Sequence, residues 1–122
     1  MPLIKDLNIL KDPRKRPAIV VVYSPECGWS KRAQETIDRA VSESSKLRGH
    51  VFRYNAVPSQ NSAEIRAAHS AWPATFPGIE IQRYPTVFVF SRGANYFDVH
   101  EFKGSLAEWG PNTVSTMEAL IK

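Results

Sequence analysis

The sequence predicts an α/β fold, in which a central mixed sheet is flanked by helices. Two unbroken apolar runs, 18–24 and 86–90, are rich in β-branched and aromatic residues. Such runs are typical of strands that are buried on both faces. Helical spacing of apolar residues begins soon after the first run, at Ala33, Ile37 and Ala40. A strand that leads into a helix is the repeating unit of an α/β protein.

The elements follow one another with clear boundaries. In chain order, they are a strand at 18–24, a helix from about Ser30 that stops by Gly49, a strand at 50–57, a short helix from Asn61 to about Ser70, an ordered loop at 71–85, strands at 86–90 and 96–104, and a closing helix interrupted at Gly110 and Pro111. The first two strands, joined by a helix, are expected to be parallel, and the last two to form a hairpin. Helices should therefore cover both faces of the sheet.

Length and composition predict one domain spanning residues 1–122. Within it, residues 1–16 form an N-terminal extension or first element, and residues 71–82 form an insertion loop. The aromatic residues of that loop, Trp72 and Phe76, either face a partner or pack on the domain itself. No apolar run approaches the roughly 18 residues that a membrane span requires, so none is expected.

The cysteine content sets an expectation for the compartment. Cys27 is the only cysteine, so the chain forms no intramolecular disulfide. A reducing compartment, the cytoplasm, is therefore the default. No signal-peptide pattern precedes the first strand; the endoplasmic reticulum lumen or an extracellular location would apply if a leader had been removed.

Charge and histidine spacing suggest no further binding partner. The net charge is +4, and the densest basic cluster is "KDPRKRP" at 11–17. No aromatic residues interleave with those charges, so nucleic-acid binding is not expected. His50, His69 and His100 are widely spaced, which matches no closed zinc site; we expect surface or strand residues and no metal.

Cys27 stands where the first strand turns into the helix, in "YSPECGWSKR". The thiolate is the reactive form of cysteine, and unpaired amides at a helix N-terminus favour an anion. Lys31 and Arg32 add positive charge, whereas Glu26 opposes it. A lowered pKa is therefore expected for Cys27.

Two separated motifs resemble the thioredoxin superfamily. Pro-x-Cys-Gly-x-Ser resembles the active-site turn of that superfamily, and "RYPTVFVFSRG" at 83–93 resembles its cis-proline segment. The later "FKGSLAEW" is similar to the last strand end and helix of these proteins. The resemblance covers about residues 15–122 and implies a thioredoxin-like fold.

The resemblance also implies a function and roles for single residues. It implies a thiol–disulfide oxidoreductase in which Cys27 is the nucleophile and Ser30 stands in the place of the resolving cysteine. Pro85 would follow a cis peptide bond, and the backbone of Tyr84 would pair with an extended substrate. Trp29 would line the site. The implied partners are protein disulfides and glutathione, and no cofactor is required.

Two departures from the family pattern change the expected chemistry. Ser30 cannot attack a mixed disulfide, so release would need an outside thiol such as glutathione. The family also buries an acidic residue on the strand six positions before the first cysteine. Here that position is Val21. The residue that helps to deprotonate the resolving thiol is thus absent together with that thiol.

Three alternatives stay open from the sequence. "CGWS" is similar to the CGFS motif of monothiol glutaredoxins, which bind glutathione and a [2Fe–2S] cluster, although their lysine is missing from "AIVVVYS". The chain can also be a redox-inactive thioredoxin-like module that binds proteins. Finally, Ser30 can be an engineered replacement that traps mixed disulfides in a CGWC protein.

Overall fold

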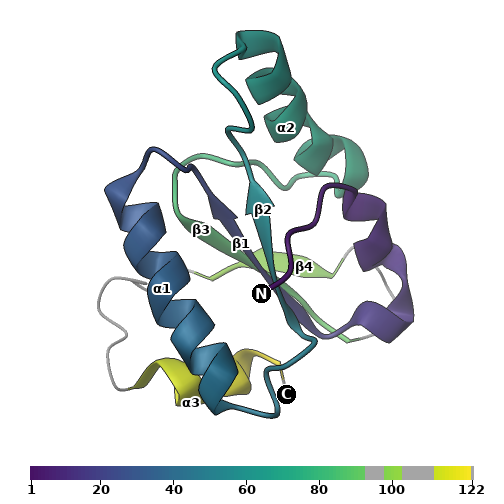
Figure 1. Ribbon diagram of the computed structural model, residues 1–122. Coiled ribbons are helices and arrows are strands. Elements are labelled where there is room, and N and C mark those ends of the chain that lie inside the picture. Colours follow the sequence, from purple (N-terminus) through teal and green to yellow (C-terminus); the bar gives the residue numbers. More distant parts are fainter. Residues whose placement is uncertain (93–97, 103–111, 122) are drawn as a thin grey trace.

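The sheet of this computed structural model has the mixed topology expected from the sequence (Figure 1). The structure describes residues 1–92, 98–102 and 112–121. Within them, the strands are β1 (Ala18–Tyr23), β2 (Val51–Asn55), β3 (Thr86–Phe90) and β4 (Val99–Glu101), in the spatial order β2-β1-β3-β4. β1 is parallel to β2, whereas β3 is antiparallel to both β1 and β4. The parallel first pair and the antiparallel last pair are thereby confirmed.

Helices cover both faces of the sheet, as expected (Figure 1). The α-helices are α1 (Gly28–Glu43), α2 (Ser62–Thr75) and α3 (Thr113–Leu120), and two short 3₁₀ helices, η1 (Leu7–Lys11) and η2 (Pro13–Lys15), precede β1. α1 and α3 lie on one face, and α2 and η1 on the other. No helix in the described parts of the chain is both long and apolar enough to cross a bilayer.

All six side chains of β1 are buried, because β1 supplies both hydrophobic cores. Successive side chains of a strand point to opposite faces. Ile19 and Val21 pack with α1 and α3, in a cluster that also holds Ile37, Ala40, Leu47, Val51, Val87 and Met117. Val20 and Val22 pack with η1 and α2, in a cluster that also holds Ile4, Leu7, Leu10, Ala18, Phe52, Tyr54, Ala56, Trp72, Phe76, Phe88 and Phe90. The unbroken apolar run is thus explained by two-sided burial.

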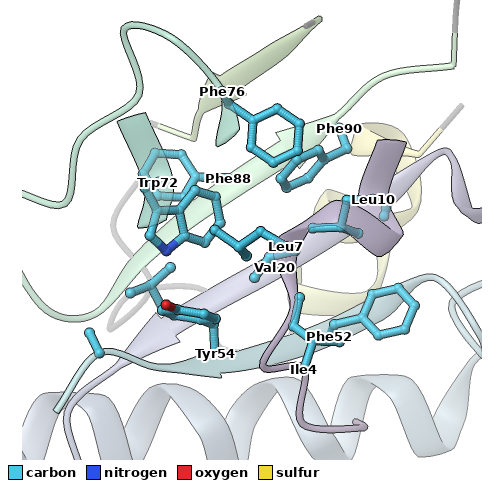
Figure 2. Packing of buried hydrophobic residues seen from close by; sticks show 13 residues of the cluster. Ile4, Leu7, Leu10, Val20, Phe52, Tyr54, Trp72, Phe76, Phe88 and Phe90 are labelled. Atoms are coloured by element: carbon cyan, nitrogen blue, oxygen red, sulfur yellow. The ribbon is translucent and has the colours of Figure 1, made fainter. Parts of the chain in front are cut away.

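The expected loop at 71–82 is partly wrong, since α2 continues to Thr75 through Pro73. A proline inside a helix costs about 3 kcal/mol. Burial of Trp72 and Phe76 offsets that cost, because both are almost fully buried, with the Trp72 ring centroid 4.6 Å from that of Phe88 (Figure 2). These two aromatic residues therefore pack on the domain itself, and the alternative that they face a partner is excluded.

The N-terminal segment is the first element of the fold. The backbone of Ile4 donates to Arg53 O at 2.9 Å, and Arg53 N donates to Pro2 O at 2.9 Å, so residues 2–4 cover the free edge of β2. Leu7 and Leu10 of η1 are buried against the sheet. Within the basic cluster, Arg16 is also buried, and its Nε donates to Leu10 O at 2.9 Å.

Other expected boundaries shift by a few residues or are not described. α1 begins at Gly28 rather than near Ser30 and ends at Glu43; Gly49, with φ of 82°, lies in the turn before β2. α3 begins at Thr113, after the expected break, and buries Met117. The expected break at Gly110 and Pro111, and most of "FKGSLAEW", lie outside the described residues.

Replacing Trp72 by alanine tests the packing of α2. We expect W72A to lower the free energy of unfolding by about 3–5 kcal/mol, because a buried indole is removed from a packed aromatic cluster. Urea unfolding measures the change. Trp29, which is 58% exposed, provides the matched control, and W29A should cost less than about 0.5 kcal/mol. Equal losses in the two variants would contradict the assignment of Trp72 to the core.

Candidate functional site around Cys27

Cys27 is the N-cap residue of α1, and its side chain is partly exposed. The short turn after β1 is closed by a hydrogen bond from Cys27 N to Ser24 O at 3.1 Å. Cys27 has extended backbone angles, and its carbonyl accepts the first helical bond, from Lys31 N at 3.1 Å. The sulfur therefore stands beside the free amides that open α1.

Hydrogen bonds from the first turn of α1 lower the pKa of Cys27 below its ordinary value. The backbone N–H of Ser30 is the largest cause, followed by the hydroxyl of Ser30, and the backbone N–H of Trp29 adds to them. Burial acts in the opposite direction but is weaker. The expected lowering is confirmed in direction. Its causes are local donors to the sulfur, whereas Lys31 and Arg32 have exposed side chains.

Ser30 is fully buried, and its hydroxyl is hydrogen-bonded within the turn. Its Oγ accepts a hydrogen bond from Ser24 N at 3.2 Å. This hydroxyl thus satisfies a buried amide of the turn, and it also helps to lower the pKa of the neighbouring thiol. Whatever the origin of Ser30, its side chain joins the strand end to the helix start.

Tyr84, far from Cys27 in sequence, meets it in space. The carbonyl oxygen of Tyr84 lies 4.0 Å from Cys27 Sγ, although the two residues are 57 positions apart. The peptide bond between Tyr84 and Pro85 is cis. Because β1 and β3 are antiparallel, with Val22 paired to Thr86, the last residues of β1 and the first residues of β3 lie at the same end of the sheet.

Trp29 is the exposed aromatic residue beside the thiol, with 58% of its surface accessible. The guanidinium carbon of Arg32, one helical turn onward in α1, lies 5.3 Å from the centre of the Trp29 ring. A cation over the ring face favours one orientation of the indole. Exposure at this place fits the expected contact with substrate, which stays a prediction.

His69 belongs to this neighbourhood, a position that the sequence did not reveal. Its Nε2 is hydrogen-bonded to the hydroxyl of Tyr84, and the two rings meet edge to face, with centroids 5.6 Å apart. Both side chains are half-buried. The helix predicted from Asn61 to about Ser70 includes His69, and its place on α2 agrees with that, but its contact with Tyr84 was not predicted. Helical spacing could have indicated that His69 faces the domain, because it lies one turn before the buried Trp72 on the same helix.

Val21, where the resemblance to the thioredoxin superfamily would lead one to expect a buried acid, is fully buried in an apolar cluster with Ile19 and Ile37. Its strand thus brings no carboxylate beneath the site. Across residues 1–92, 98–102 and 112–121, no three His, Cys, Asp or Glu side chains converge as metal ligands would.

Comparison with known proteins gives no further identification. No protein-family model matches the chain, and no curated protein matches it significantly. Any function assigned to the site therefore rests on its residues and their geometry.

The pH dependence of Cys27 alkylation tests the local cause of its reactivity. Hydrogen bonds to a thiolate favour the ionised form, so we expect the reactivity midpoint to fall below the ~8.5 of an ordinary thiol. S30A removes one of these donors and should move the midpoint upward. S42A removes an exposed serine from α1 and should leave it unchanged. An S30A midpoint equal to that of the wild type would refute the role of the hydroxyl.

Proposed function

We propose that the chain is a thioredoxin-like thiol–disulfide exchange protein that acts through Cys27. The observation that carries the proposal is the 4.0 Å approach of Cys27 Sγ to the carbonyl oxygen of Tyr84. It places a thiol with a lowered pKa beside main-chain atoms of a residue that lies outside regular strand. The Tyr84 carbonyl accepts from the Cys27 thiol, and once that thiol has ionised the carbonyl can accept from an extended polypeptide instead.

The proposed reaction has two exchange steps. In the first, the Cys27 thiolate attacks one sulfur of a substrate disulfide; a bond forms between Cys27 and that sulfur, and the other substrate sulfur leaves as a thiolate. In the second, an external thiolate such as glutathione attacks the mixed disulfide at the substrate sulfur and releases Cys27. The substrate is then left disulfide-bonded to the external thiol, and Cys27 returns unchanged.

The external thiol is needed because Ser30 occupies the position from which a second cysteine would attack. The Ser30 hydroxyl contributes to the lowered pKa of Cys27, which favours both the attacking thiolate and the thiolate that is released. Val21 provides no carboxylate to activate a resolving thiol. These features favour monothiol exchange, with protein disulfides or glutathione adducts as the proposed substrates.

The decisive experiment follows the reaction of the protein with a disulfide by intact mass. At pH 7, we expect Cys27 to form a mixed disulfide with oxidised glutathione faster than free cysteine does, because more of it is ionised. The adduct should persist until reduced glutathione is added. C27S should form none. A rate equal to that of an unperturbed thiol would overturn the proposal and favour the redox-inactive binding module.

Restoring a cysteine at position 30 tests whether the scaffold supports a dithiol reaction. We expect S30C to form an internal disulfide with Cys27 and to release a bound substrate without added thiol, because the new sulfur would take the place of an oxygen that contacts Cys27. Mass spectrometry after trapping with an alkylating reagent counts the free thiols. S42C, on the exposed side of α1, is the matched control and should not resolve the adduct. If S30C accumulates the mixed disulfide as the wild type does, the dithiol geometry is wrong.

A further inference from the structure

Tyr84 has two ends with different partners, and this joins helix α2 to the thiol. Its carbonyl oxygen faces Cys27 Sγ at 4.0 Å, whereas its hydroxyl is hydrogen-bonded to Nε2 of His69. The two residues of the side-chain pair are 15 positions apart and come from separate segments. Pairing with an extended polypeptide involves only the carbonyl end of Tyr84, so the proposed function assigns no role to its hydroxyl.

Regular sheet pairing does not hold Tyr84 in place, because β3 begins two residues later, at Thr86. Tyr84 instead packs at the margin of the aromatic cluster that contains Trp72. Its ring meets the ring of His69 at an interplanar angle of 89°, and the hydrogen bond adds a directional contact. The side chain therefore contributes to the placement of the Tyr84 backbone.

His69 is suited to this task because α2 is itself firmly anchored. Trp72, one turn onward, is fully buried among the rings of Tyr54, Phe76, Phe88 and Phe90. The position of His69 is thus tied to the core of the domain. Burial also raises the pKa of Tyr84, so its phenol stays protonated and keeps its hydrogen-bonding capacity at neutral pH.

We propose that His69 is a positioning residue for exchange with polypeptide disulfides: its hydrogen bond to the Tyr84 hydroxyl holds the Tyr84 carbonyl beside Cys27. The inference rests on the proposed function, since it concerns the same thiol. It adds a substrate preference. The rate of exchange with a polypeptide that pairs with the backbone of Tyr84 depends on where that backbone lies. The rate of exchange with a small disulfide depends mainly on the reactivity of the Cys27 sulfur.

The test compares two probes on each variant. One is an extended peptide whose single cysteine is disulfide-linked to thionitrobenzoate, and the other is dithiodipyridine. We expect H69A and Y84F to lower the ratio of the peptide rate constant to the small-disulfide rate constant about threefold to tenfold, the factor that one hydrogen bond provides. H69Q, whose amide can still bond to the hydroxyl, should retain most of the ratio.

Two further variants separate positioning from general damage. In H69A/Y84F, the ratio should fall no further than in the single variants, because both remove the same bond. His100 is an exposed histidine on β4 and serves as the matched control, so H100A should leave both rate constants unchanged. The reaction with dithiodipyridine also reports that each variant still presents its thiol.

The outcomes distinguish this inference from the proposed function. If wild-type protein exchanges with both probes but H69A and Y84F keep the wild-type ratio, His69 has no positioning role. Loss of both rate constants in equal proportion would likewise assign His69 to stability alone. If the wild type reacts with neither probe faster than an ordinary thiol, the proposed function fails, and the inference fails with it.

Discussion

The antiparallel pairing of β1 with β3 is the constraint on which the candidate site depends. It places the turn after β1 and the segment before β3 at the same end of the sheet. Cys27 lies at the end of that turn, and Tyr84 lies in the segment before β3. Cys27 Sγ is therefore 4.0 Å from the carbonyl oxygen of Tyr84. A one-residue slip of either strand would exchange the side chains that fill the two cores, so the register of this pair is strongly specified.

The two cores secure that pairing from opposite sides. On one face, α1 packs on the sheet through Ile37 and Ala40. This packing fixes the position of the helix whose first turn lies beside the thiol. On the other face, Trp72 anchors α2 and with it His69. The thiol and the backbone opposite it are thus supported by different layers of the molecule. The His69–Tyr84 hydrogen bond is the contact by which the α2 layer reaches the site.

Local patterns in the sequence were sufficient for much of the fold and part of the site. Unbroken apolar runs located β1 and β3, and the start of α2 was predicted correctly at Asn61, whose side chain caps the helix by accepting from Ala63 N and Glu64 N. The lowered pKa of Cys27 followed from its place at a helix start. The extent of α2 was missed because local rules weigh Pro73 as a breaker, whereas burial of Trp72 and Phe76 decides the outcome.

The sequence by itself determined the order of strands and helices and the presence of one thiol at a strand-to-helix turn, because these depend on residues that are near neighbours in the chain. The resemblance already implied that Tyr84 would lie at the site of Cys27. Only the tertiary structure decided that its carbonyl oxygen comes within 4.0 Å of the sulfur, that Ser30 Oγ accepts from Ser24 N, and that His69 bonds to the hydroxyl of Tyr84. These contacts join segments whose relative placement is set by sheet register and core packing, which no local pattern encodes.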